Sequence, residues 1–205
     1  MQINIDKKTG IFTGIIVVLV AVIFFMMGSR NNSDGFFGMN HSMMHNDNKS
    51  SSSLVGSDTM FLQMMIPHHQ QAVDISDLAI KTSKDAELVA LAKSIRDGQS
   101  SEIVEMKKWL SDAGQSFTMD HSMGMGMGGM LTDSDLSTLK SLSGSAFDIY
   151  WLEKMIGHHE GALHMVTMIQ DSPAVNIKNF GEGVTTVQSA QITQMQAMLK
   201  RLGAK

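Results

Sequence analysis

The chain contains an internal repeat in which each copy carries two segments of helical character. The segment DTMFLQMMIPHHQQA, which begins at Asp58, lines up with DIYWLEKMIGHHEGA, which begins at Asp148. Further along, QSSEIVEM from Gln99 lines up with QSAQITQM from Gln188. A period close to 90 residues indicates a duplicated helical hairpin and not a solenoid of short repeats. Two such hairpins predict an all-α fold, a bundle of four long helices.

Capping signals predict the limits of the first hairpin. Asp58 is the expected N-cap of a first helix that runs to about Thr82. Ser83 is the expected N-cap of a second helix, which ends near Ala113 with Gly114 just beyond it.

The second hairpin has similar signals. Ser145 with Asp148 resembles a capping box for its first helix, and Ser172-Pro173 resembles an N-cap followed by a first helical proline for its second. A shorter helix is expected over residues 133–142, behind Thr132.

The second helix of each hairpin carries polar residues on the face that is expected to be buried. Residues spaced by three and four form an a/d seam, which faces a bundle interior. The two seams are Gln99, Glu102, Met106 and Trp109, and Gln188, Gln191, Met195 and Met198. Buried polar groups need partners, and the His residues of the other helices are the nearest candidates.

Residues 9–29 contain no charged side chain and are mostly Ile, Val, Leu, Phe and Met. As a helix, such a run spans about 30 Å, the thickness of a bilayer's hydrocarbon core. Lys7 and Lys8 precede it, so an N-terminal transmembrane helix would leave residues 1–8 in the cytoplasm and anchor the rest of the chain on the extracytoplasmic side, periplasmic or outer. A cleaved signal peptide, which would make the protein secreted, is the alternative.

Cys is absent, which excludes disulfides, thiolate metal sites and Cys nucleophiles. A formal net charge of −4 without a Lys/Arg block does not suggest a nucleic-acid partner. The 205 residues do include 20 Met and 8 His.

The pattern Met-x-His-Ser-Met occurs twice outside the predicted helices. One copy lies in a polar linker over residues 30–56, and the other lies in a Met/Gly-rich loop over 114–131, inside the region 57–205 assigned to the bundle. A thioether in a solvated loop gains nothing from burial, so capture of a soft metal ion is favoured over chance. The candidate loop ligands are Met39, His41, Met43, Met44, His45, Met119, His121, Met123, Met125, Met127 and Met130.

Each hairpin carries two adjacent His residues, preceded by Met and Ile. Adjacent side chains point about 100° apart on a helix, so the two are not expected to face one spot, whereas a Met three or four positions earlier could close on one ion with each His. Thioether and imidazole suit Cu(I), and imidazole with carboxylate also admits Cu(II) or, less readily, zinc. The predicted ligands are Met64, Met65, His68, His69, Glu102, Met106, Met155, His158, His159, Glu160, His164, Met165 and Met195.

Two simpler interpretations stay open. Most of the Met residues could be core filler, and at least one His of each pair could be structural, hydrogen-bonded to Glu102 or Gln191. Catalytic motifs are incomplete, because Leu163 stands where a zinc protease would have its second His. No catalytic residue is predicted, although a ferritin-like metal oxidase is an alternative function, as is a non-metal envelope scaffold or sensor.

The segments DTMFLQMMIPHHQQAVDIS, GQSSEIVEMKKWL, LKSLSGSAFDIYWLEKMIGHHEGALHMV and QSAQITQMQAMLKRL resemble the family called domain of unknown function 305, over about residues 57–202. The resemblance implies a ferritin-like four-helix bundle, usually exported, whose better-known members bind copper and support copper tolerance. Carried over by motif, it points to Met65, His68, His69, Met155, His158 and His159, with Glu102, Met106 and Met195 behind them.

The expected function is therefore extracytoplasmic binding of copper, mainly Cu(I), for sequestration or transfer in metal tolerance. Expected partners are metal ions, the lipid bilayer through residues 9–29, and a copper transporter or chaperone. A homo-oligomer is a further candidate assembly.

Overall fold

The computed structural model describes residues 54–118 and 128–204, and within these ranges it contains helices and no strands. The elements are α2 (Gly56–Thr82), α3 (Ala86–Asp112), α4 (Asp133–Ser141), α5 (Gly144–Val166), the 3-10 turn η1 (Thr167–Ile169) and α6 (Val175–Arg201). The all-α prediction is confirmed. The described residues include no helix long and apolar enough to cross a membrane, and the predicted anchor at 9–29 lies outside them.

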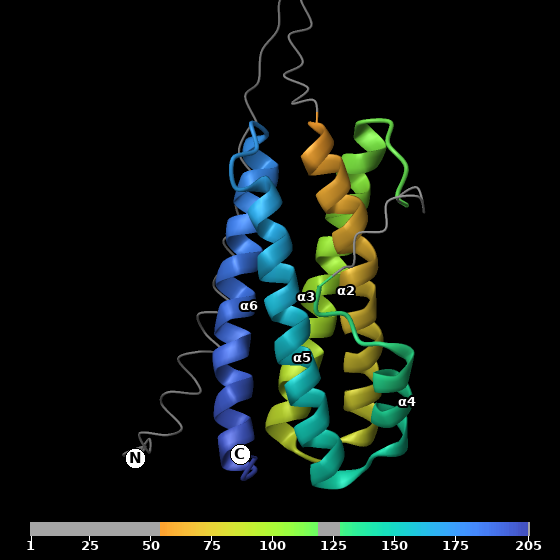
Figure 1. Cartoon of the computed structure of the whole chain (residues 1–205), viewed down its shortest axis with the longest axis vertical. Helices are drawn as coiled ribbons and strands as arrows, with labels where there is room; N and C mark the ends of the chain where they lie inside the picture. Colours follow the sequence, from red (N-terminus) through yellow and green to blue (C-terminus); the bar gives the residue numbers. More distant parts are fainter. Residues whose placement is uncertain (1–53, 119–127, 205) are drawn as a thin grey trace, which may run out of the picture. The chain divides into compact units, whose positions relative to one another are not determined.

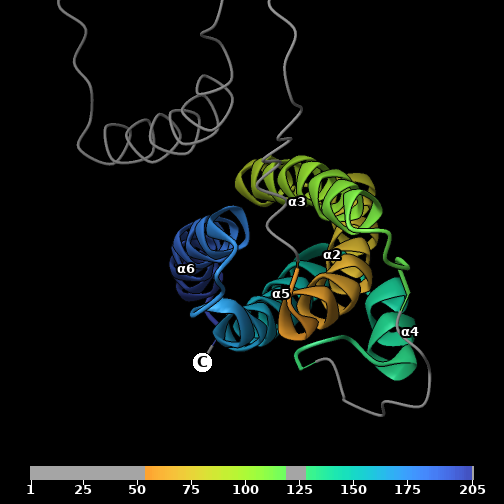
Figure 2. The ribbon, with the colours of Figure 1, turned by 90° about the horizontal axis from the view of Figure 1, so that it is seen from above.

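Four long helices run side by side as two antiparallel hairpins (Figure 1). One hairpin pairs α2 with α3 and the other pairs α5 with α6, and α2 packs against α5 to join them. The view along the bundle shows the four helices around a common interior, with α4 outside them beside α2 and α5 (Figure 2). The duplicated segments of the sequence are therefore the duplicated halves of one bundle.

Two predicted caps in the first hairpin are wrong by a few residues. Asp58 lies inside the first turn of α2, where its carboxylate accepts a hydrogen bond from the Val55 N–H at 3.2 Å. The N-cap of α3 is Asp85 and not Ser83, because the Asp85 carboxylate accepts from two free N–H groups of the first turn, each at 3.0 Å. A carboxylate two or three residues before those N–H groups satisfies them.

The second hairpin also begins away from its predicted caps. α5 begins at Gly144, so Ser145 and Asp148 lie within the helix, and α6 begins at Val175 and not at Pro173. Thr132 caps α4 as predicted, within a capping box. The errors are local, since sequence signals place helix ends only to within one or two residues.

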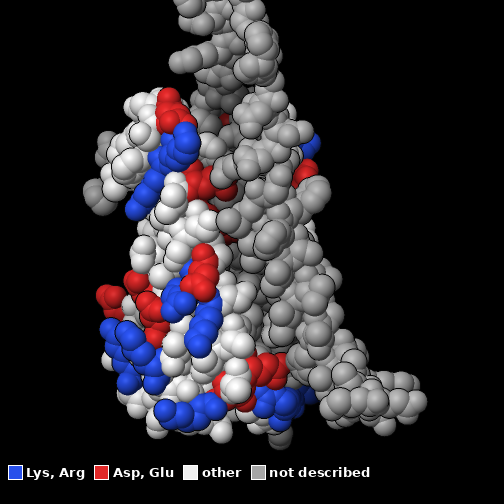
Figure 3. Space-filling model, turned by 180° about the vertical axis from the view of Figure 1, so that it is seen from behind, with Lys and Arg blue, Asp and Glu red and all other residues white. Residues whose placement is uncertain are grey.

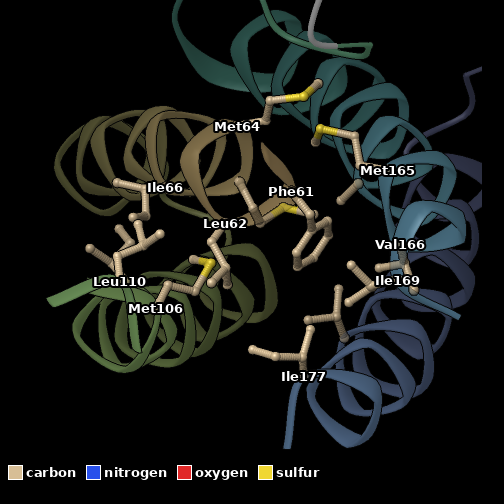
Figure 4. Packing of buried hydrophobic residues seen from close by; sticks show 14 of the residues in the cluster. Phe61, Leu62, Met64, Ile66, Met106, Leu110, Met165, Val166, Ile169 and Ile177 are labelled. Carbon is tan, nitrogen blue, oxygen red and sulfur yellow. The ribbon is translucent and has the colours of Figure 1, made fainter. Parts of the chain in front are cut away.

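The interior consists of two apolar clusters. The first, here called the Phe61 cluster, includes Phe61, Met106, Ile169 and Ile177 (Figure 4). The second, here called the Trp151 cluster, includes Leu88, Leu139, Phe147 and Trp151. Trp151 is completely buried, and its indole N–H donates to the Ile75 carbonyl at 3.0 Å. Along each long helix, polar residues separate the part in one cluster from the part in the other.

Candidate metal centre

A layer of polar side chains crosses the bundle between the two apolar clusters. One turn of each long helix supplies two members, and we call the set the imidazole layer: His68 and His69 of α2, Gln99 and Glu102 of α3, His158 and His159 of α5, and Gln188 and Gln191 of α6. All except Glu102 are buried, and the four His residues have no exposed surface. Polar groups at such depth cost free energy unless they are partnered, so the contacts of each ring are informative.

Two of the imidazoles have equivalent partners on the neighbouring helix. The Nε2 atom of His69 lies 2.7 Å from a carboxylate oxygen of Glu102, and the Nε2 atom of His159 lies 2.8 Å from the amide oxygen of Gln191. Both oxygens are acceptors, so each Nε2 carries the proton and donates it. In the neutral ring, the lone pair is then on Nδ1. The structural role that sequence suggested for these His residues is present, and it leaves one nitrogen of each ring free.

The other two imidazoles stack on each other across the α2–α5 contact. Their ring centroids are 3.7 Å apart with an interplanar angle of 34°. His68 donates from Nε2 to the Gly128 carbonyl at 3.2 Å, whereas neither nitrogen of His158 has a partner. Within the described residues, all four Nδ1 atoms are buried without a hydrogen-bond partner. Such nitrogen atoms are suited to coordinate a metal ion.

The ring spacings distinguish the pairs that could share an ion. A metal–nitrogen distance of about 2 Å, plus about 1 Å from nitrogen to ring centre, puts two rings around one ion at roughly 6 Å. The adjacent pairs have centroid separations of 6.3 Å (His68–His69) and 6.4 Å (His158–His159). The stacked pair is too close for an ion in line between its rings. The rings of each adjacent pair are therefore far enough apart for one ion to lie between them.

Burial favours the neutral form of His68, His158 and His159. Desolvation, with a smaller effect of neighbouring imidazoles, lowers the pKa of His68 to about 3 and that of His159 to about 4. The same causes hold the pKa of His158 well below its ordinary value. A metal ion must compete with protons for an imidazole nitrogen, and at neutral pH the Nδ1 atoms of His68 and His159 carry no proton to displace.

Thioethers lie on both sides of the imidazole layer. Met65 and Met106 belong to the Phe61 cluster, and Met155 and Met195 belong to the Trp151 cluster. All four are completely buried and fill the core. Each also lies within four residues of a member of the imidazole layer on its own helix.

The remaining predicted ligands are spread over three places. Met64 and Met165 are buried between α2 and α5, where their sulfur atoms point toward one another (Figure 4). Glu160 and His164 are exposed on α5, away from the layer. Met130 is half-buried, and the other loop candidates lie outside the described residues.

A short segment at the end of the Gly-rich loop is held against the layer, a contact that no sequence pattern predicted. Gln71 donates to the Leu131 carbonyl at 2.9 Å and accepts from the Leu131 N–H at 2.7 Å. This pair of hydrogen bonds holds the segment in a position where the Gly128 carbonyl reaches His68. A Cβ atom on Gly161 would lie 1.9 Å from the Gly128 oxygen, so the close approach requires glycine at 161.

Replacing Gly161 by Ala is expected to lower the free energy of unfolding by about 1–3 kcal/mol, because the new methyl group must displace Gly128. Gly157→Ala is the matched control, since a Cβ at that position of the same helix meets nothing within 4 Å. The control should instead gain up to about 1 kcal/mol from helix propensity. Urea unfolding measures both, and equal effects at the two glycines would contradict the packing described above.

The part of the outer surface formed by residues 54–118 and 128–204 offers no comparable site. Acidic and basic side chains intermingle on the face shown in Figure 3. Several are paired, such as Arg201 with Asp85 and Lys154 with Asp135, each at 2.7 Å. Among the described residues, no three His, Asp or Glu side chains converge to hold a metal ion. An ion in the imidazole layer would therefore be held by few ligands, two imidazoles with or without sulfur, which is a donor set for a soft cation.

Comparison with known proteins identifies one family and several solved structures of similar fold. The family described as domain of unknown function (DUF305) matches residues 58–199. A putative secreted DUF305 protein from Streptomyces coelicolor is 32% identical with a TM-score of 0.68, over 76% of this chain and 96% of that one. A DUF305 fragment from Deinococcus radiodurans, 24% identical over 72% of this chain and 98% of that one, shares the fold with a TM-score of 0.66.

CopM, solved in a Cu(I)-bound form, is 28% identical with a TM-score of 0.60, over 70% of this chain and 96% of that one. Structures of CopM with Cu(II) and with silver are also similar to this chain. No curated protein sequence matches the chain.

Proposed function

The chain belongs to the DUF305 family, and on that basis we propose that it binds copper outside the cytoplasm, mainly as Cu(I), and sequesters it or passes it on. The observation that carries this proposal is the set of four buried Nδ1 atoms without hydrogen-bond partners, three of them on rings whose other nitrogen is already committed to an acceptor. Evolution of a core normally removes such orphaned polar atoms, because each costs about 1–3 kcal/mol. A function that uses them accounts for their presence.

The donor set favours a monovalent soft ion. Neutral imidazoles with thioethers nearby suit Cu(I) or Ag(I). A divalent ion would bring two charges into a layer whose one charged member is Glu102, and a buried charge is costly without matching counter-charges. The shortage of converging carboxylates also counts against an iron-oxidising centre. CopM, with its Cu(I)-bound and silver-bound forms, supports the same choice at the level of the family.

The location and role follow from the rest of the chain. The apolar segment 9–29 is proposed as the anchor, with the bundle on the extracytoplasmic side. The existence of a putative secreted relative supports this placement. The Met-x-His-Ser-Met tracts at 39–43 and 119–123 are proposed to capture ions for the bundle, which would exchange them with a copper transporter or chaperone.

The double variant His68→Ala/His158→Ala tests the proposal, because it removes one ring from each adjacent pair. We expect it to lose the Cu(I) and Ag(I) ions of the layer while its helix content stays unchanged. The measurement is elemental analysis of the full-length protein after titration and buffer exchange, with circular dichroism to report folding. His164→Ala is the matched control, since it removes an exposed imidazole of α5. Undiminished ion content in the double variant would move the sites out of the layer.

A further inference from the structure

The duplication gave the two halves of the imidazole layer the same geometry but different charges. His69 corresponds to His159 in the repeat, and Glu102 corresponds to Gln191. The ring nitrogen meets an oxygen at 2.7 Å in the first half and at 2.8 Å in the second. That oxygen is part of a carboxylate in the α2–α3 half and part of a neutral amide in the α5–α6 half.

The charge lies in the half that can tolerate it. The Glu102 side chain is 25% exposed, so water reaches part of the carboxylate. Gln191 is 3% exposed, and a carboxylate there would be desolvated in the core. The other two amides of the layer, Gln99 and Gln188, are also buried and uncharged. Burial therefore explains why only one half of the layer carries a carboxylate.

A carboxylate behind an imidazole strengthens the imidazole as a ligand. The acceptor pulls on the Nε2 proton, so electron density at Nδ1 rises, and the negative charge offsets the charge of a bound cation. A neutral amide fixes the same tautomer and supplies only a dipole. For a monovalent ion, the α2–α3 half is then close to neutral when occupied, and the α5–α6 half carries one buried positive charge.

We propose that Glu102 is a positioning residue that makes the two halves unequal, so that the first monovalent ion is held beside His69 and not beside His159. This inference rests on the proposed function, since it assigns an order to ions bound by the imidazole layer. The contact of Glu102 is with His69, and its effect on the ion acts through that ring.

The test is a titration of the full-length protein with Ag(I), followed through the side-chain ¹⁵N signals of the His residues. In the wild type, the Nδ1 signal of His69 should shift at a lower ratio of Ag(I) to protein than that of His159. Glu102→Gln should weaken binding at the first half by about 10- to 100-fold, the usual effect of losing such a carboxylate, and the order should disappear. In the exchange variant Glu102→Gln/Gln191→Glu, His159 should respond first.

The controls separate this inference from simpler explanations. Asp97→Asn removes one charge from the same helix at a side chain that is 67% exposed, and it should leave the order intact. A purely structural Glu102 would change the free energy of unfolding and leave the order of the signals as in the wild type. A buried carboxylate at position 191 could prevent folding of the exchange variant. In that case the order of the His69 and His159 signals in Glu102→Gln alone tests the role of Glu102.

Two results would overturn the inference. One refutes only the role of Glu102, and the other also refutes the proposed function. If the signals of His69 and His159 shift together in the wild type, or if their order survives Glu102→Gln, the role of Glu102 is refuted and the proposed function stands. If Ag(I) shifts no imidazole signal of the layer, the proposed function is refuted together with the inference.

Discussion

Saturating Cu(I) is expected to raise the melting temperature of the wild-type protein by about 10 °C and to leave that of His68→Leu/His158→Leu unchanged. An ion that binds the native state at 1,000 times its dissociation constant adds about 4 kcal/mol of stability. For a domain of this size, each kcal/mol corresponds to about 2–4 °C. The double variant lacks one ring of each adjacent pair, so neither half keeps the two imidazoles that would hold an ion. Thermal unfolding followed by circular dichroism, under anaerobic conditions, measures both.

The same variant should be more stable than the wild type when no metal is present. Its substitutions remove the Nδ1 atom of His68 and both nitrogens of His158, all buried without a hydrogen-bond partner. They also remove the 3.2 Å hydrogen bond from His68 Nε2 to the Gly128 carbonyl, which offsets part of the gain. Leu has a similar volume, and removal of such atoms is expected to gain about 1–3 kcal/mol. Urea unfolding with a chelator measures this gain.

His159→Leu is the control for that gain, because it leaves Gln191 without its partner. This variant should gain nothing or lose stability. If the His68→Leu/His158→Leu variant proved less stable than the wild type, these rings would be structural and the interpretation of the layer would be wrong.

Acidification of the metal-free protein from pH 6.5 to pH 4.5 is expected to lower its free energy of unfolding by about 2 kcal/mol for each imidazole that stays neutral in the native state. The native pKa values of His68, about 3, and of His159, about 4, lie below the value of about 6.5 in the unfolded chain. In this interval the unfolded state binds protons that the native state does not, so stability falls as the pH falls. Urea unfolding at intervals of half a pH unit gives the slope.

The range above pH 4.5 isolates the imidazoles from the carboxylates. Hydrogen bonds from Lys154 and Thr132 lower the pKa of Asp135, so its contribution is lost only at more acidic pH. The His68→Leu/His158→Leu variant should show a much shallower slope, since it retains only His159 among the imidazoles whose pKa is lowered. A slope equal to that of the wild type would contradict the assignment of the pH dependence to this layer.

Much of the fold could be predicted from the repeat, whereas the helix starts could not. The helices around both His pairs are where the repeat and the seam spacing predict them. The predicted and observed caps lie within two residues of each other: Asp85 caps α3 in place of Ser83, and Ser143 is the N-cap of α5 in place of Ser145. The choice between such neighbours depends on backbone angles that the sequence does not specify. Ser83 in fact accepts from the Asp85 N–H at 3.1 Å, so it supports the residue that caps.

The candidate site was also predictable from the sequence only in part. The repeat identified both His pairs, and the seam identified Glu102 and Gln191 as their partners. Spacing by four residues also selected Glu160 and His164, which the structure places on the exposed side of α5. A spacing of three or four defines a face of a helix, but the packing of the neighbouring helices decides whether that face is inside.

The sequence by itself determined which helices exist, their duplication, and which side chains form the polar turn of each, because helix periodicity and hydrogen-bonding needs act within a few residues. Only the tertiary structure decided that the rings of adjacent His residues lie 6.3–6.4 Å apart, that the rings of the two halves stack at 3.7 Å, and that Gly128 reaches His68. These distances depend on how α2 and α5 pack, and on the contact of Gly161 with Gly128, more than 30 residues apart in the chain. The exposure that separates Glu102 from Gln191 has the same origin, since burial is a property of the assembled helices.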